Sequence, residues 1–103
     1  MSLYNVRLEK RVIGAILKSP DVLAEVDSFL TVEDFYNDVH KSIYSVIRNA
    51  YVAGDRIDVV LISDKMKNIG ITAKDSVNIY EYLDGITFSA PKASVVPDYA
   101  RQL

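Results

Sequence analysis

The sequence predicts an all-α fold, a compact orthogonal bundle of about six helices. Apolar residues recur every three or four positions along most of the chain, which is the spacing of the buried side of a helix. Asn, Ser, Thr or Asp residues stand at the expected helix starts, and Gly or Pro residues separate the helical stretches. Of the 103 residues, 50% are hydrophobic and 25% are charged, which is typical of a folded globular domain.

The first helix is expected to begin after Asn5 and to lie in the centre of the bundle. Asn5 can cap it, and its apolar positions cover about half of the helix circumference. These positions are Leu8, Val12, Ile13, Ile16 and Leu17. A second helix is expected to begin at residues 19–21. Ser19 can cap it, Pro20 suits its first position because it has no N–H group, and the negative charge of Asp21 lies near the positive end of the helix. Its buried positions are Val22, Leu23, Val26, Phe29 and Leu30.

A short turn and a long third helix follow. Residues 31–34 have capping-type spacing, and we expect this turn to place Phe35 and Tyr36 inside the bundle. The third helix should run from position 37 or 38 to position 53, because Gly54 can adopt the left-handed conformation that ends a helix. Its buried positions are Val39, Ile43, Val46, Ile47 and Ala50.

A fourth helix is expected between Asp58, which can cap it, and Gly70, which can end it. Its apolar positions are Val59, Ile62 and Met66. Residues 57–62 are rich in β-branched side chains, which favour strands. They lack the two-residue alternation of a half-buried strand, however, and no partner strand is visible. We therefore predict a helix here.

Two helices complete the bundle. The fifth should begin near Ser76 or Val77 and bury an apolar stripe. That stripe contains Ile79, Tyr80, Leu83 and Ile86. The sixth should begin at Ser94 and carry Tyr99 towards the end of the chain. Pro97 fits there because the N–H groups of a first turn have no partner within the helix.

The composition excludes several kinds of chemistry. With no Cys and one His, the chain has neither a disulfide framework nor the ligands of a structural zinc site. The four glycines are too far apart for a phosphate-binding loop, and the acidic residues do not follow the order of a calcium-binding EF-hand loop. We therefore assign no catalytic, cofactor-binding or metal-binding residue.

The charge distribution argues against direct nucleic-acid binding and against insertion into a membrane. Twelve Lys and Arg against fourteen Asp and Glu give a net charge of −2, which argues against an independent nucleic-acid binder. We expect any contact with DNA to be indirect. The uncharged runs are too short to span a membrane, and Arg7, Lys10 and Arg11 lie within the apolar pattern of the first helix. We therefore expect a cytoplasmic protein that does not enter membranes.

Two polar residues stand out within the predicted helices. His40 could form an acid–base pair with Glu33 or Asp34, because a nearby carboxylate tunes an imidazole towards neutral pKa values. The simpler interpretation, which we favour, is a partly buried His40 that hydrogen-bonds a neighbouring element. Glu9 falls in the apolar sector of the first helix, where a carboxylate needs a partner. That partner is either the free N–H groups of its own first turn or, in a binding role, a ligand.

Seven tyrosines in 103 residues are more than such a domain needs for its core. A Tyr ring buries apolar area while its hydroxyl keeps a polar partner, so Tyr is common at protein interfaces. Taken one at a time, each is better explained by packing at the edge of the core. The surplus favours a protein-binding module. Our candidates for protein contacts are Tyr51, Tyr82 and Phe88, with Tyr82 expected to be exposed on the fifth helix.

Four stretches of the sequence resemble the N-terminal domain of DnaB-type replicative DNA helicases of bacteria and phages. They are Glu9 with Val12 to Leu17, then Asp34-Phe35-Tyr36 with His40 and Ile43-Tyr44, then Gly54 with Ile57-Asp58, and finally Tyr82-Leu83 with Tyr99-Ala100. Their order and spacing agree from about Asn5 to the end of the chain. One departure is Arg7, which stands where such helicases usually carry an acidic residue.

The resemblance implies an all-α head without catalytic residues of its own. In that family these domains pair and form the collar of a hexamer, and they help recruit primase and in some cases a helicase loader. ATP and magnesium would be bound by a motor domain elsewhere in the parent chain. By this resemblance Gly14 permits close approach of a neighbouring helix, Phe35 and Tyr36 anchor the corner, and Gly54 and Asp58 set a turn and a cap.

The domain organisation and two alternatives follow from the same comparison. We expect residues 1–4 to be an added start or a disordered segment, and residues 5–103 to be one helical domain of a longer helicase chain. The first alternative is the structurally similar C-terminal domain of a primase, which binds the helicase. The second alternative, which we consider remote, is a small hydrolase that uses His40.

Overall fold

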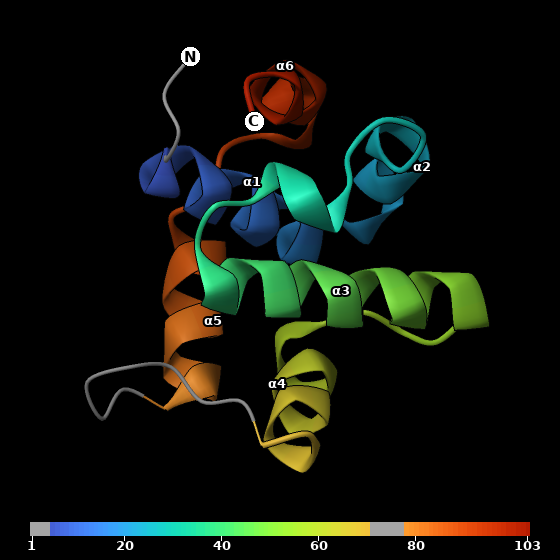
Figure 1. Cartoon of the computed structure of the whole chain (residues 1–103), viewed down its shortest axis with the longest axis vertical. Coiled ribbons are helices and arrows are strands. Elements are labelled where there is room, and N and C mark those ends of the chain that lie inside the picture. Colours follow the sequence, from blue (N-terminus) through green and yellow to red (C-terminus); the bar gives the residue numbers. More distant parts are fainter. Residues whose placement is uncertain (1–4, 71–77) are drawn as a thin grey trace.

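The computed structural model describes residues 5–70 and 78–103, and these residues contain α-helices and short 3₁₀ turns but no strand. The six α-helices are α1 (Val6–Lys18), α2 (Leu23–Val26), α3 (Asp38–Ala53), α4 (Val59–Asn68), α5 (Ile79–Phe88) and α6 (Val96–Arg101). The 3₁₀ turns span Pro20–Val22, Val32–Asp34 and Ala93–Val95. In Figure 1, α3 runs across the molecule, with α4 and α5 crosswise on one side and α2 and α6 on the other. The predicted all-α bundle is confirmed.

Helix α1 is central, as its wide apolar face predicts. Every residue from Val12 to Leu17 is buried, and the helix contacts α3, α5 and α6. Gly14 lies directly against the backbone of α5, because a Cβ atom built on it would stand 2.1 Å from the carbonyl oxygen of Ile86. The role that we assigned to Gly14, close approach of a neighbouring helix, is therefore confirmed.

The boundaries of α3 and α4 follow from capping. The side chain of Asn37 accepts a hydrogen bond from the His40 N–H group at 3.1 Å, and Gly54 ends α3 with a φ of 77°. The side chain of Asp58 accepts from the Leu61 N–H group at 2.8 Å and starts α4. The β-branched stretch after Ile57 is helical, as predicted, because Ile57 and Ile62 are buried in the common core.

The observed starts of α2 and α5 differ from the predicted ones. The Ser19 side chain makes no capping bond, and the chain restarts through the 3₁₀ turn Pro20–Val22 before α2. Helix α5 begins at Ile79 because Asn78, not an earlier residue, caps it through the Glu81 N–H group. The predicted starts at 76 and 77, like the expectation for residues 1–4, lie outside the described residues.

The last helix also begins later than expected. Residues Ala93–Val95, which include the predicted start at Ser94, form a 3₁₀ turn, and α6 follows from Val96. Pro97 stands in the first turn of α6, where its missing N–H group breaks no helical bond. The prediction for Pro97 is thus confirmed, while the sixth helix is shorter than its apolar pattern indicates.

The corner before α3 buries one aromatic side chain and exposes the next. Phe35 is 1% exposed and its ring centroid lies 5.0 Å from that of Tyr44. Tyr36 is 56% exposed, which corrects our expectation that it is enclosed. The reason is that Phe35 has extended backbone angles, and successive side chains of extended backbone point to opposite sides. Among the described helices, none has the length and apolarity needed to cross a membrane.

Candidate protein-interaction site

Two of the three predicted contact residues lie on the surface. Phe88, the last residue of α5, is 90% exposed, and Tyr51 near the end of α3 is 38% exposed. Tyr80, which we expected in the buried stripe of the fifth helix, is 39% exposed. Sequence reasoning also missed four exposed aliphatic side chains, Val52, Val60, Leu61 and Ile69. These four lie near the ends of α3 and α4, outside the apolar stripes, so that helical spacing alone gave no signal for them.

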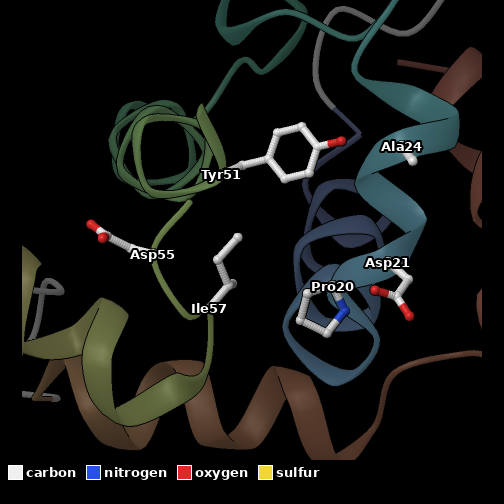
Figure 2. Close-up of a pocket in the computed structure, with 6 residues that line it drawn as sticks. All are labelled: Pro20, Asp21, Ala24, Tyr51, Asp55 and Ile57. Carbon is white, nitrogen blue, oxygen red and sulfur yellow. The ribbon is translucent and has the colours of Figure 1, made fainter. Parts of the chain in front are cut away.

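Tyr51 lines an open groove of about 400 Å³ between the end of α3 and the segment that leads into α2. In Figure 2 the Tyr51 ring reaches across from α3 towards the helix that carries Ala24, with Pro20 and Ile57 below it. The carboxylates of Asp21 and Asp55 point away from the space between these side chains. The centre of the groove is therefore apolar and aromatic, which suits contact with a protein side chain better than catalysis.

Tyr82, the third candidate, is only partly exposed and packs against the core. Its hydroxyl lies 2.5 Å from Nε2 of His40, so its polar end is directed inwards. This corrects our expectation of an exposed aromatic side chain on α5. The helical position of Tyr82, at the edge of the apolar face, did not reveal that a buried imidazole would draw the hydroxyl in.

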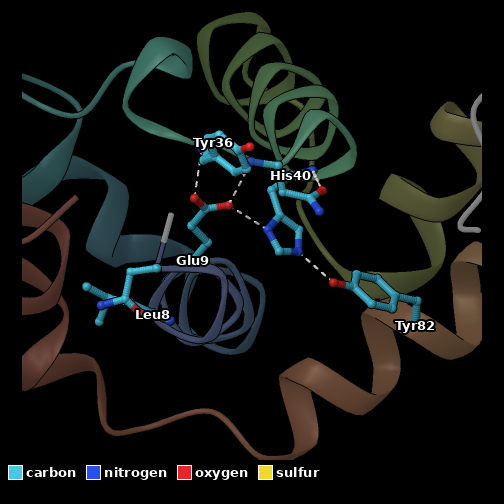
Figure 3. A network of polar contacts seen from close by, with 7 residues as sticks. Leu8, Glu9, Tyr36, His40 and Tyr82 are labelled. Atoms are coloured by element: carbon cyan, nitrogen blue, oxygen red, sulfur yellow. Dashed lines mark hydrogen bonds and ion pairs between the residues drawn. The ribbon is translucent and has the colours of Figure 1, made fainter. Parts of the chain in front are cut away.

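His40 connects Tyr82 to Glu9, so that one polar network joins α1, α3 and α5 (Figure 3). His40 is 0% exposed and Glu9 is 1% exposed. The carboxylate of Glu9 accepts hydrogen bonds from Nδ1 of His40 at 2.8 Å and from the backbone N–H groups of Tyr36 at 2.8 Å and Asn37 at 3.3 Å. Three donors from the start of α3 thus converge on one side chain of α1.

The chemistry of these groups fixes the tautomer of His40. The Glu9 carboxylate can only accept, so the imidazole proton lies on Nδ1, and Nε2 accepts a hydrogen bond from the hydroxyl of Tyr82. Burial lowers the pKa of His40 below its usual 6.5, although the hydrogen bond and the charge of Glu9 act in the opposite direction. Burial also raises the pKa of Tyr82, with a further contribution from Glu9, so the phenol stays protonated. The neutral forms of both residues suit their positions.

The predictions for His40 and Glu9 are resolved by this geometry. His40 does hydrogen-bond neighbouring elements, as we favoured, and is buried completely. Its carboxylate partner is Glu9, whereas Glu33 is exposed and Asp34 binds the N–H group of Thr31. Glu9 uses free N–H groups ahead of α3 and not those of its own first turn, because its side chain points across the core. The His40 side chain is 0% exposed, so it offers no open surface to a small molecule.

Metal-ligating residues do not gather anywhere in the described part of the chain: no three His, Cys, Asp or Glu side chains there could hold an ion together. What the described surface does carry is exposed apolar side chains at the ends of α3, α4 and α5. Such side chains can contact another protein.

A solved structure identifies the class of domain. The fold is similar to the crystal structure of the N-terminal domain of DnaB helicase from Mycobacterium tuberculosis, with a TM-score of 0.85 and 26% sequence identity. This match covers 97% of the present chain and 68% of that chain. The fold is thus that of a helicase N-terminal domain. The family model described as the DnaB-like helicase N terminal domain matches residues 1–103, and the chain belongs to this family.

Curated relatives agree with this membership. The chain is 28% identical over 97 residues to the replicative DNA helicase DnaB of Leifsonia xyli, and 26% identical over 98 residues to that of Treponema pallidum. These matches cover 94% and 95% of the present chain but 21% and 22% of the relatives. The chain therefore spans about a fifth of the length of these relatives.

Proposed function

We propose that this chain is the non-catalytic N-terminal domain of a replicative DNA helicase. In this proposal residues 5–103 form one domain of a longer, cytoplasmic protein whose ATP and magnesium are bound by a separate motor domain. The domain associates with copies of itself in the collar of a hexamer. It also docks primase and, where one is used, a helicase loader, while DNA is contacted only indirectly.

The observation that carries this proposal is the family match across residues 1–103. It favours the helicase over the primase alternative, because the relatives described above are named as helicases. The exposed side chains of Tyr51 and Phe88 support a docking role, since they present aromatic area to solvent without serving the core. The complete burial of His40 speaks against the hydrolase alternative.

Deletion of the domain from the full-length protein tests the proposal. We expect the deletion to weaken hexamer formation, measured by light scattering after size-exclusion chromatography, and to abolish capture of the primase from the same organism. In the full-length protein, Phe88→Ser and Tyr51→Ser should each weaken one of these two associations. Tyr80→Ser is the matched control, because Tyr80 is an aromatic residue of α5 that is 39% exposed and is not among the proposed contacts. Unchanged hexamers and unchanged primase capture after the deletion would refute the proposal.

A further inference from the structure

Three basic side chains gather on the outer side of α1, next to the C-terminal end of α5. Arg7, Lys10 and Arg11 are all exposed, and together with Ile86 and Ser89 they line a pocket of about 200 Å³. Their spacing of three and four residues places them on one side of the helix. The pocket thus has cationic groups on the α1 side and an apolar and a hydroxyl side chain on the α5 side.

These charges are not neutralised within the described residues. Residues 5–70 and 78–103 contain no acidic side chain within ion-pair distance of Arg7, Lys10 or Arg11. Glu9 is the one acidic residue of α1, and its carboxylate is buried and directed at His40. A concentration of positive charge therefore faces solvent on a chain whose net charge is −2.

Helix stability does not explain this cluster. Arg7 lies in the first turn of α1, where the helix dipole favours negative and disfavours positive side chains. Repulsion between like charges three and four residues apart adds to the cost. Lys10 alone has an intramolecular contact, with its Nζ atom 5.9 Å from the centroid of the Tyr82 ring. The two arginines have no such contact among the described residues, so both guanidinium groups can bind an external anion.

We propose that this pocket docks an acidic segment of a partner protein, in which carboxylate side chains stand next to an aliphatic one. The inference rests on the proposed function and specifies the chemistry of a docking partner. Guanidinium groups bind carboxylates through paired hydrogen bonds, and Arg7 and Arg11 can supply two such sites. Ile86 is a core residue that is 9% exposed, and the small uncovered part of its side chain gives the aliphatic side chain an apolar contact at the edge of the pocket, next to Ser89.

The size and surroundings of the cluster favour a protein segment over nucleic acid. Arg7 and Arg11 are separated by about 6 Å along the helix axis, so the cluster covers little more than one turn. A nucleic acid needs a longer cationic track along its phosphates. Helix α5 also carries the exposed carboxylates of Glu81 and Asp84, which repel a polyanion. A short acidic segment carries fewer charges than a nucleic acid and is repelled less.

Binding of a labelled peptide to the 103-residue chain tests the inference. The probe is a short fluorescein-labelled peptide of alternating Glu, Asp and Leu, and its partner probe has Gln and Asn in place of the acids. We expect the acidic peptide to bind, to perturb amide NMR signals at 7–11 and 86–89, and to bind about tenfold more weakly to Arg7→Glu or Arg11→Glu. Lys67→Glu, an equal charge change on exposed α4, should stay within about twofold of the wild type.

Four outcomes would overturn the inference. Three of them are no binding of the acidic peptide, equal binding of the two peptides, and equal effects of the Arg and Lys67 substitutions. Tighter binding of single-stranded oligothymidylate at the same amide signals would also overturn it, because the occupant would then be nucleic acid. Unfolding of each variant in urea verifies that the fold is intact. Since this assay uses no helicase assembly, a failed deletion experiment and a failed peptide experiment remain distinguishable.

Discussion

At the scale of single residues, hydrogen bonds between buried polar side chains fix how the core helices α1, α3 and α5 pack against one another. A buried carboxylate or imidazole without hydrogen-bond partners destabilises a protein, and its removal from water is costly. Among the described residues, every buried side-chain nitrogen and oxygen has a partner. Glu9 accepts hydrogen bonds from Tyr36, Asn37 and His40, and Nε2 of His40 accepts one from the hydroxyl of Tyr82. The network thus defines which faces of α1, α3 and α5 meet.

The hydroxyl of Tyr82 should contribute measurably to stability. In Tyr82→Phe the ring still packs, but Nε2 of His40 loses its donor at a site that is 0% exposed. We expect the free energy of unfolding, measured with urea, to fall by about 1–3 kcal/mol. Tyr80→Phe makes the same chemical change at a position 39% exposed and should alter it by less than about 0.5 kcal/mol. Equal effects at the two positions would show that the hydrogen bond to His40 is not important.

The sequence indicates that the Glu9 carboxylate needs a hydrogen-bond partner, but it does not show which residue that partner is. The apolar pattern around Glu9 is local, whereas its partner His40 lies on another helix, 31 residues later in the chain. Only the packing of α1 against α3 brings them together. The error at Tyr36 has a different origin, because a single extended residue reverses the direction of the next side chain. Helical spacing carries no information about such a residue.

At the scale of helices, local chemistry predicts starts and ends where one side chain makes the cap. Asn5, Asn37 and Asp58 each accept a hydrogen bond from the N–H group three residues later. Asn5 and Asp58 were predicted as caps, and Asn37 stands at the predicted start of the third helix. The starts of α2 and α6 were less predictable, since each helix follows a 3₁₀ turn. In such a turn the spacing of apolar residues is nearly the same as in an α-helix.

The contact between α1 and α5 provides a sharp test at this scale. In Gly14→Ala the new methyl group would overlap the carbonyl oxygen of Ile86, so the two helix backbones must separate. We expect the free energy of unfolding to fall by about 1–3 kcal/mol. Gly85→Ala is the matched control, because Gly85 lies within α5 and a Cβ atom there would meet nothing within 4 Å.

The two glycine substitutions should therefore act in opposite directions. Alanine is favoured over glycine within a helix, so Gly85→Ala should raise the free energy of unfolding by about 0.5–1 kcal/mol. Urea unfolding of both variants under the same conditions measures the difference. A stabilised Gly14→Ala protein would mean that α1 and α5 do not approach as closely as described.

At the scale of the whole molecule, the fold class and the family could be predicted from the sequence, but the surfaces could not. The core residues recur with helical periodicity, and this periodicity is what a bundle requires. Exposed residues such as Val52 and Arg11 follow no such rule, because solvent accepts many patterns. The neighbours of Arg11 on α5 became visible only when the helices were placed together.

The stability of the whole domain should depend on pH through His40. Burial lowers the pKa of His40 in the folded state, so the unfolded chain binds a proton more readily, at its usual pKa of 6.5. The contribution of neutral His40 is therefore complete above pH 6.5 and is lost as the pH falls towards the lowered folded-state value. Because only one proton is bound, the free energy of unfolding can fall by at most about 1.4 kcal/mol for each unit of pH.

Comparison with His40→Gln isolates this contribution. Gln lacks a group that titrates in this range, although it will lower the stability at every pH by disturbing the network. Urea unfolding at about pH 7.5 and about pH 5.5 should show a larger loss for the wild type than for His40→Gln, since other groups titrate alike in both proteins. If both lose the same free energy, or the wild type gains stability in acid relative to His40→Gln, the imidazole accepts a proton at least as readily in the core as in water. The hydrogen bond and charge of Glu9 would then balance or outweigh the effect of burial.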